Sequence, residues 1–319
     1  VRKVLSDVGY SSEGVTMDTF VHRQSPDIAE AVNASKERRG GVSDNQIDWF
    51  QGAGDQGVMI GYACDETKQL MPMPVVLANR IVRELSACRQ SSYIQGILPD
   101  GKAQVTVEYE NGKPVRLDSV VVSCQHKEEK DLKKLEAEIR KKVLLPALRP
   151  LPPDEETKIY INPSGRFVCG GLDADTGLTG RKLMVDSYGS MVPHGGGAFA
   201  GKDCSKVDRS AAYMARYIAK NIVAAGLASK CQVSLAYAIG VAQPVMVQVD
   251  TFGTGNVCAD DCLELAIPLV FGLTPKQIVD TLRLTRPIFR QTAAFGHFGR
   301  KEFPWEHTDK AEALRNAVI

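Results

Sequence analysis

GGGAFAGKDCSKVDRS, residues 195–210, is the stretch of this chain that says most about its fold and its chemistry. Its first half is nearly bare backbone, and its second half carries Lys202, Lys206, Asp203 and Asp208. Exposed backbone amides, ammonium groups and carboxylate oxygens are what a polyphosphate and its magnesium ion require. The stretch therefore predicts a nucleotide site, and the alternative is a flexible glycine loop followed by a solvated, charged helix.

An ordinary P-loop does not explain this stretch. Read from Gly196, the spacing fits G-x-x-x-x-G-K, but Asp203 stands where a P-loop needs a serine or threonine hydroxyl for the metal. The preceding residues 190–194 contain a proline and make a poor buried strand. Phosphate chemistry is therefore expected here without the P-loop fold.

The size and charge of the chain limit its class. Its 319 residues suffice for two or three domains with a sizeable core. The formal net charge of +1 gives no electrostatic reason to expect nucleic acid or a membrane as a partner. No apolar run reaches the length that crosses a bilayer.

The eight cysteines are scattered, which predicts reduced thiols and a cytoplasmic location. Cys258 and Cys262 form the one close pair, but no second pair and no nearby histidine completes a zinc set. His194, beside the glycine run, is the one histidine with a local case for function. No arrangement of serine or cysteine with histidine indicates a nucleophile on the protein.

Hydrophobic periodicity predicts an α+β fold. The clearest signals are a hairpin around Asn111-Gly112, with strands over residues 104–110 and 115–123, and a long helix over residues 207–227. Further helices are expected over residues 72–89, 128–145 and 274–284. Further strands are expected over residues 14–21, 158–162 and 166–169, and in two runs within residues 231–254.

A second cationic group lies in GGLDADTGLTGRK, residues 170–182. Arg181 could grip phosphate oxygens with its planar fork, and Lys182 could neutralise a second phosphate. Asp173 and Asp175 precede them, so a surface turn with local ion pairs is the alternative.

Three other features have weaker local support. Asp55 lies in GAGDQG, residues 52–57, where a turn aspartate making an Asx hydrogen bond is the alternative. Phe167 could stack on a purine or fill a core. The charged, glycine-rich residues 35–45 are either a disordered surface loop or a mobile lid over a site.

Taken together, these segments resemble the S-adenosylmethionine synthetase (methionine adenosyltransferase) family. GAGDQG resembles the family's hexapeptide, and GGGAFAGKD at 195–203 resembles its glycine-rich nonapeptide, with Ala200 where serine is common. The other matching motifs, in order, are QSPDI at 24–28, GLTGRK at 177–182, KVDRS at 206–210, AIG at 238–240, GHFG at 296–299 and FPW at 303–305. The resemblance covers almost the whole chain.

The resemblance implies three similar α+β domains related by an approximate threefold, with subunits packed through flat sheets and sites between them. It places the remainder of an N-terminal domain at residues 1–52, with the active-site loop at 35–45, a central domain at 53–170 and a C-terminal domain at 171–319. A homodimer, or a tetramer made of two dimers, is expected.

The resemblance also implies a reaction. The sulfur of L-methionine attacks C5′ of ATP, and the expelled triphosphate is hydrolysed to phosphate and pyrophosphate. The sulfur is already nucleophilic, so positioning and charge stabilisation carry the catalysis. The implied cofactors are two Mg²⁺ ions and K⁺.

The family's functional residues carry over to particular positions of this sequence. The catalytic cations would be Lys102, Arg181, Lys182, Lys202 and Lys206. ATP would be bound by Asp100, Lys102, Phe167, Asp175, Arg181, Lys182, Ala198, Lys202, Lys206 and Ile239, with Asp175 on the ribose and Phe167 and Ile239 on the adenine. Methionine would meet Gln24, Asp55 and Lys206, with Gln24 and Asp55 reaching in from the neighbouring subunit, and Asp208 would hold magnesium.

One departure from the family stands out. The family's initial His-Pro-Asp-Lys motif, with acidic residues for a second magnesium and for potassium, has no match in these residues. Because Val1 aligns inside the family's first domain, we expect that segment to precede it. The alternatives are a non-catalytic partner subunit of the same fold and, less well supported, a P-loop-like nucleotide hydrolase.

Overall fold

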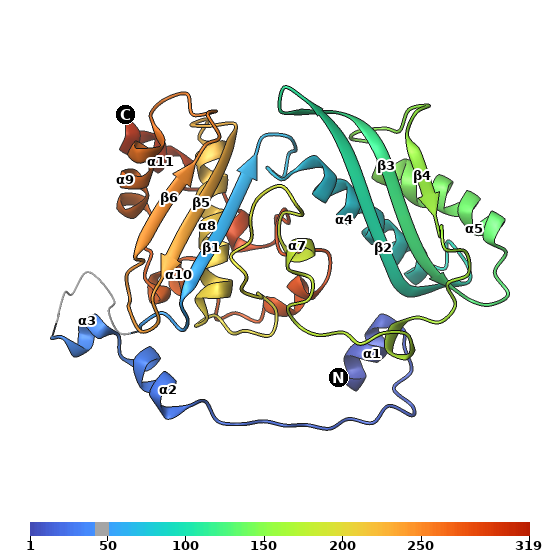
Figure 1. Ribbon diagram of the computed structural model, residues 1–319, viewed down its shortest axis with the longest axis horizontal. Coiled ribbons are helices and arrows are strands. Elements are labelled where there is room, and N and C mark those ends of the chain that lie inside the picture. Colours follow the sequence, from blue (N-terminus) through green and yellow to red (C-terminus); the bar gives the residue numbers. More distant parts are fainter. Residues whose placement is uncertain (42–50) are drawn as a thin grey trace. The chain divides into compact units, whose positions relative to one another are not determined.

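The computed structural model describes residues 1–41 and 51–319. The chain divides into two compact units, each built from two separate segments (Figure 1). Unit 1 comprises Val1–His22 and Met73–Leu178, and unit 2 comprises Arg23–Pro72 and Thr179–Ile319. Both units combine helices with a small sheet, as an α+β fold requires. The domain boundaries at residues 52 and 170 stay a prediction.

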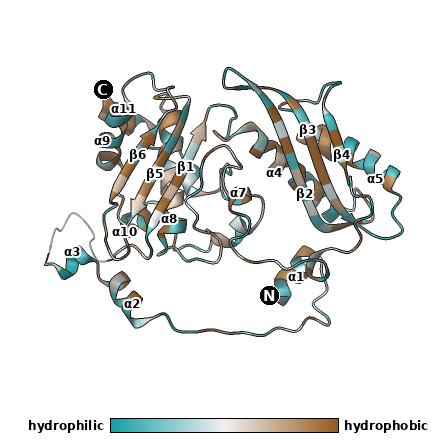
Figure 2. Cartoon of the chain, in the orientation of Figure 1, coloured by the Kyte–Doolittle hydropathy of each residue, from teal (hydrophilic) through white to brown (hydrophobic). Residues whose placement is uncertain are grey.

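The sheet of unit 1 is built on the predicted hairpin. β2 (Ile97–Glu110) and β3 (Lys113–His126) pair antiparallel, and β4 (Lys158–Ile161) joins β3 in parallel. Asn111 and Gly112 form the turn with φ of 50° and 75°, a region that asparagine and glycine tolerate. Figure 2 shows polar and apolar residues alternating along the two long strands, as the period of two predicts.

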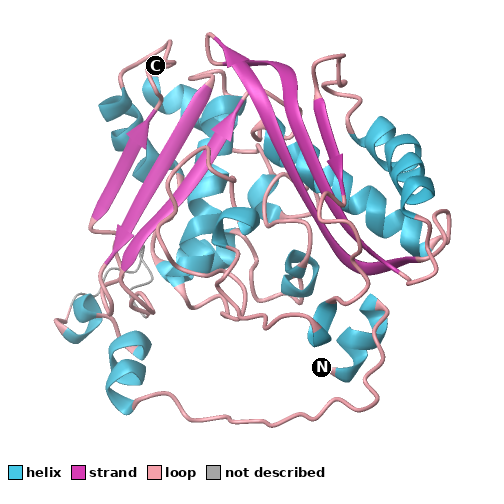
Figure 3. Cartoon of the chain, turned by 45° about the vertical axis from the view of Figure 1, so that its right-hand side comes forward, coloured by secondary structure: helices cyan, strands magenta, loops and turns pink. Residues whose placement is uncertain are grey.

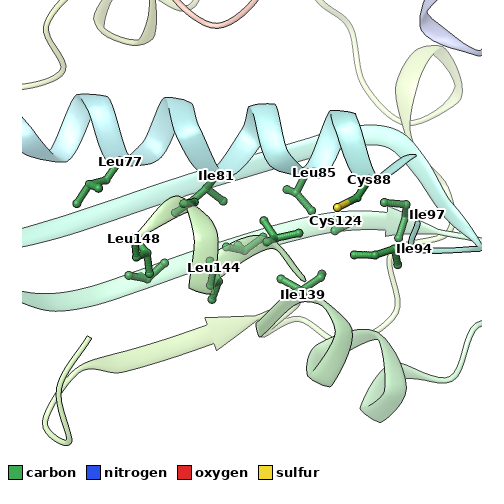
Figure 4. Close-up of a cluster of buried hydrophobic side chains, with 14 of the residues drawn as sticks. Leu77, Ile81, Leu85, Cys88, Ile94, Ile97, Cys124, Ile139, Leu144 and Leu148 are labelled. Carbon is green, nitrogen blue, oxygen red and sulfur yellow. The ribbon is translucent and has the colours of Figure 1, made fainter. Parts of the chain in front are cut away.

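Helices bury their apolar stripes against this sheet to form the core of unit 1 (Figure 4). α4 (Met73–Gln90) confirms the helix predicted over 72–89 and buries Leu77, Ile81 and Leu85. Leu135 and Ile139 extend the core from the opposite helical segment. The remaining helices of this unit are α1 (Arg2–Val8), α5 (Leu132–Ile139), a π-helical turn at Arg140–Leu144, α6 (Leu145–Ala147) and a 3₁₀ helix at Gly171–Asp173.

Three predictions in unit 1 were inaccurate. α5 begins after residue 128, because the Asp131 side chain accepts a hydrogen bond from the Lys134 backbone N–H at 2.7 Å and caps the helix there. Residues 166–169, all described, form no strand, because Phe167 bonds with its backbone to one residue only, His126. Residues 14–21, also described, form no strand either, and they end in the highly exposed Phe20 and Val21.

The sheet of unit 2 joins strands from distant parts of the chain. β1 (Gly57–Cys64) pairs antiparallel with β5 (Lys230–Tyr237), which pairs antiparallel with β6 (Met246–Asp250). α8 (Val207–Ala224) packs on β1 and β5 and is buried along almost its whole length. Figure 3 shows α8 and its neighbours beside the three strands. The predicted helix over 207–227 and the two β runs after it are therefore confirmed.

Shorter helices complete unit 2. Thr274 caps the predicted Thr-Pro helix with a full capping box, since its side chain accepts from the Gln277 backbone and the Gln277 side chain accepts in return. The helix with Pro268 in its interior was not predicted, because proline is unfavourable there. The helices are α2 (Pro26–Asn33), α3 (Lys36–Arg39), α7 (Leu183–Asp186), α9 (Asp260–Val270), α10 (Pro275–Thr281) and α11 (Ala311–Val318).

The structure also bears on the cysteines, on membrane-spanning helices and on the predicted loop at 35–45. All eight cysteines lie in described residues, and each is a free thiol. Among the described helices, no single one is long and apolar enough to cross a membrane, although α9 and α10, bent by 76°, pass together on length and composition. Of the predicted loop at 35–45, residues 36–39 form α3, and residues 42–45 lie outside the described part.

Candidate functional site

The glycine-rich stretch lies directly against β1 and the start of α8. A Cβ added at Gly195 would overlap the carbonyl oxygen of Val58, and one added at Gly197 would overlap the carboxylate of Asp208. Side chains are therefore excluded at both positions, and the bare backbone of the loop lies beside a carboxylate. This is the arrangement that the sequence predicted for a phosphate-binding loop.

Lys202 and Asp208 form an ion pair at the C-terminal end of this loop. The Lys202 ammonium donates to Oδ2 of Asp208, and the two side chains keep 29% and 12% of their surface exposed. Asp208 belongs to the first turn of α8, where the amide groups of the helix favour negative charge. The pair is thus accessible, and an incoming polyphosphate can compete with Asp208 for the lysine.

The predicted Arg181 loop reaches the same stretch. A Cβ at Gly180 would lie 3.3 Å from the Cβ of Ala198, and one at Gly201 would lie 3.1 Å from Cγ2 of Thr179. Arg181 and Lys182 follow at once, and both are exposed. The Lys182 ammonium donates to the Arg181 carbonyl at 3.2 Å. The structure therefore brings two cationic segments to one place in unit 2.

The hexapeptide at 52–57 lies between Lys206 and the Ile239 segment. The Ala53 N–H donates to the Val241 carbonyl, and the Gly240 N–H donates to the Ala53 carbonyl, both at 2.9 Å. A Cβ at Gly54 would lie 2.7 Å from the Ser205 carbonyl oxygen and 3.2 Å from Cδ of Lys206. Within unit 2 the structure therefore gathers Asp55, Arg181, Lys182, Ala198, Lys202, Lys206, Asp208 and Ile239.

Two predicted methionine contacts differ in their surroundings. Oδ1 of Asp55 accepts from the N–H of the next residue, Gln56, at 2.8 Å, whereas an Asx turn would bond the residue after that. Gln24 is exposed in the segment immediately before α2. The hexapeptide of Asp55 therefore lies against the Lys206 segment of its own chain, and the role of Asp55 and Gln24 in a neighbouring subunit stays a prediction.

The other predicted ATP residues, Asp100, Lys102, Phe167 and Asp175, belong to unit 1. Oδ2 of Asp100 accepts from the Gly171 N–H at 2.8 Å, and Asp175 donates its N–H to the Gly171 carbonyl at 3.4 Å. Phe167 is partly buried and bonds to His126, and Lys102 is exposed on β2. Unit 1 thus brings Asp100 and Asp175 to one glycine.

Comparisons with known proteins bear directly on this arrangement. Residues 50–167 match the central domain of S-adenosylmethionine synthetase, and residues 169–307 match its C-terminal domain. An S-adenosylmethionine synthase of Desulforudis audaxviator (strain MP104C) is 52% identical over 326 residues, which is 99% of this chain and 82% of that protein. The chain belongs to the S-adenosylmethionine synthetase family. The predicted resemblance is confirmed.

The family expectation of metal ions was tested on the described residues. They contain no group of three or more histidine, cysteine, aspartate or glutamate side chains that could hold a metal. Mg²⁺ commonly takes one or two protein carboxylates and completes its shell with water and substrate phosphates. Asp208, beside the bare loop, fits such a single ligand, whereas nothing in the described part identifies ligands for a second Mg²⁺ or for K⁺.

His194 contacts the glycine-rich loop through a hydrogen bond from the loop backbone. Its Nδ1 accepts from the Gly196 N–H at 2.8 Å, and burial lowers the pKa of the imidazole, while Asp208 opposes the shift. It lines a cavity of about 10 Å³ together with Tyr188, Phe199 and Asp208. The hydrogen bond of His194 is therefore made with the backbone of the loop.

Three buried residues next to the cationic loops could not be predicted from the sequence. Arg209 lies within the KVDRS motif and is 4% exposed, and Tyr213 and His297 are buried beside it. Burial lowers the pKa of His297 to about 3 and raises that of Tyr213 to about 12. Only the neighbouring family motifs pointed toward them, because local sequence does not reveal that an arginine is buried.

Proposed function

We propose that this protein makes S-adenosylmethionine from ATP and L-methionine. The methionine sulfur forms a bond to C5′ of ATP while the bond to the triphosphate oxygen breaks, and the triphosphate is then hydrolysed to phosphate and pyrophosphate. The observation that carries the proposal is the gathering of Arg181, Lys202, Lys206 and Asp208 around a bare glycine loop in a member of this family.

The residues suit a reaction that needs no base on the protein. A thioether sulfur attacks without losing a proton, so the enzyme must orient the substrates and stabilise the anionic leaving group. Arg181, Lys182, Lys202 and Lys206 offer four cationic groups from two adjacent loops of unit 2. Lys102, in unit 1, is assigned to the same task.

The remaining assignments follow the chemistry of each group. Asp175 accepts hydrogen bonds from the ribose, Phe167 and Ile239 cover the adenine, and Asp100 and Ala198 complete the ATP site. Gln24, Asp55 and Lys206 bind methionine, with Gln24 and Asp55 supplied by the neighbouring subunit. Asp208 contributes one oxygen to Mg²⁺, which when bound neutralises phosphate charge.

The proposal includes an assembly. We infer domains at 1–52, 53–170 and 171–319 with approximate threefold symmetry, and a cytoplasmic homodimer or tetramer whose subunits pack through flat sheets, with a second Mg²⁺ and K⁺ as cofactors. A non-catalytic partner subunit is not favoured, because the relative aligned along 99% of the chain is named a synthase.

The test is turnover by the protein expressed from its complete coding sequence. With ATP, methionine, Mg²⁺ and K⁺ we expect S-adenosylmethionine, phosphate and pyrophosphate in equal amounts. Lys202→Met should lower kcat by about 10²- to 10³-fold, as the loss of one charge-stabilising group does. The matched control is Lys276→Met, an exposed lysine of α10 paired with Asp280.

The control should keep turnover within about twofold, because exposed ion pairs contribute little. Absence of product from a correctly folded wild-type protein rejects the proposed function. Equal activity of Lys202→Met and the wild type rejects the role of the glycine loop.

A further inference from the structure

A series of hydrogen-bonded, buried polar side chains begins at the backbone of Lys202. Nη1 of Arg209 donates to the Lys202 carbonyl at 2.8 Å, and its Nε donates to the hydroxyl of Tyr213 at 3.0 Å. The same hydroxyl lies 2.7 Å from Nδ1 of His297. Because the Lys202 carbonyl accepts from Arg209, the backbone of the catalytic lysine is fixed from within the protein.

This series of hydrogen bonds ends next to the second cationic loop, which carries Arg181 and Lys182. The backbone N–H of His297 donates to the carbonyl of Asp186 at 3.1 Å, and the Trp305 indole donates to the His297 carbonyl at 2.9 Å. Asp186 ends α7, the short helix that begins immediately after Lys182. The loop of Lys202 and the loop of Arg181 and Lys182 are thus connected through three buried residues.

Packing leaves these residues little freedom. The ring of Tyr213 stacks on Trp305 with centroids 3.8 Å apart, and the Arg209 guanidinium lies 3.6 Å above the Phe289 ring. Nη2 of Arg209 donates to Thr292 at 2.8 Å, so all three nitrogens of its fork have partners. A buried network with several hydrogen bonds to one guanidinium fork restricts the geometry of its members.

We propose that Arg209, Tyr213 and His297 are positioning residues that hold the two cationic loops at a fixed spacing for the triphosphate. The proposal rests on the proposed function and adds residues that act through Lys202, Arg181 and Lys182. Cationic side chains that are already in position need no reorganisation when negative charge develops on the leaving triphosphate. This preorganisation is what makes them effective in catalysis. Displacement of a catalytic group by about 1 Å can cost 10²-fold in rate.

The test compares two tyrosines of the same helix. Tyr213→Phe removes the hydroxyl that joins Arg209 to His297 and keeps the ring on Trp305. The matched control is Tyr217→Phe, one turn later in α8, whose buried hydroxyl donates to Asp309 at 2.6 Å and touches neither cationic loop. Both changes delete one hydroxyl, so both should lower the melting temperature by a similar amount.

Only Tyr213→Phe should lower turnover and weaken the binding of triphosphate. We expect its kcat to fall about 10- to 100-fold, with the KM for methionine within about twofold of the wild type. The Kd for inorganic triphosphate, measured by calorimetry, should rise by about tenfold, because the cations no longer stand at the matching spacing. Tyr217→Phe should change neither quantity.

The outcomes separate the two proposals. A wild type without turnover contradicts the proposed function and this inference with it. An active wild type with Tyr213→Phe equal to Tyr217→Phe in kcat and triphosphate binding overturns the positioning role alone. If Tyr213→Phe does not fold, Thr292→Val decides, because it removes one acceptor of Arg209 and must then reproduce the loss of triphosphate binding.

Discussion

At the scale of single residues, Gly195 shows how tightly the glycine-rich loop is fitted. We expect Gly195→Ala to destabilise the protein by about 1–3 kcal/mol, because its Cβ would overlap the backbone of β1 and force the loop to move. Gly177→Ala is the matched control, since a Cβ there meets no atom within 4 Å. The melting temperature and kcat should fall in Gly195→Ala only. Equal values of both quantities in the two variants would contradict the close contact.

His297 makes stability depend on pH. Burial lowers its pKa in the folded protein to about 3, whereas an unfolded histidine titrates near 6.5. Below pH 6.5 the unfolded chain binds a proton at His297 and the folded protein does not. The contribution of His297 to the free energy of unfolding is therefore fully present above pH 6.5 and is lost as the pH falls toward 3. The free energy of unfolding should fall by up to about 1.4 kcal/mol per pH unit from this group.

Urea unfolding at pH 7 and pH 5 measures this effect. The loss of stability between the two pH values should be smaller in His297→Gln than in the wild type, and His22→Gln, an exposed position, should behave as the wild type. Identical pH dependence in wild type and His297→Gln contradicts the assignment.

The predictability of the site also differs between residues. Lys202, Lys206 and Asp208 could be proposed from sequence because charge density beside bare backbone is a local signal. Arg209 stands next to Asp208 with the same polar character, yet it points into the protein and binds the carbonyl of Lys202. The contacts that bury Arg209 come from Phe289 and Thr292, which are distant in sequence, so no local pattern distinguishes its role.

At the scale of elements, α8 is held to the C-terminal part of the chain by a buried ion cluster. Glu306 accepts from Arg216 and Lys220, both at 2.8 Å, and Arg216 and Glu306 are fully buried. We expect Glu306→Gln to cost about 3–5 kcal/mol, because it leaves buried positive charge without its partner. Asp280→Asn, which removes an exposed ion pair, should cost at most about 0.5 kcal/mol.

Denaturant unfolding monitored at Trp305 compares the two variants. A loss of similar size in both would show that the buried cluster contributes no more than a surface pair. The nearby Tyr217–Asp309 hydrogen bond attaches the same helix to the same segment, so the double variant with Tyr217→Phe should show non-additive losses.

Elements with a strong local signal could be predicted closely. α4, the β2–β3 hairpin and α8 followed from apolar periodicity and from an Asn-Gly turn. The strand predicted at residues 14–21 was wrong, because alternation alone cannot say whether a neighbouring strand will offer backbone partners. The start of α5 was shifted because the capping side chain of Asp131 decided the boundary, whereas the start of α10 was predicted from its Thr-Pro signal.

At the scale of the whole molecule, the long stretch between α1 and α2 joins the two units and is largely exposed. We expect brief trypsin treatment to cut after Arg23 before it cuts within α4 or α8. The fragment that ends at Arg23 should stay bound after cleavage, because Tyr10 donates to Gln125 at 3.1 Å within unit 1. Mass spectrometry under native conditions would show this, and early cleavage in α8 would contradict it.

The division into units could not be derived from local patterns. β1 pairs with β5, and the whole of Met73–Leu178, which belongs to the other unit, lies between them in the sequence. Residues 58–63 are apolar in the sequence, but this alone predicted neither the strand β1 nor its partner. The family motifs do not supply this pairing either, because the resemblance places GAGDQG at the start of the central domain and the nonapeptide in the C-terminal domain.

The pairing of β1 with β5 also has a consequence for synthesis. When the ribosome has finished β1, its partner strand has not yet been translated, and at about 5–20 residues per second the delay is roughly 10 to 30 s. Unit 1 can fold during that interval, since all of its residues precede Thr179. The nascent β1 must meanwhile stay without its partner β5, so ribosome-associated chaperones should matter most while residues 65–230 emerge.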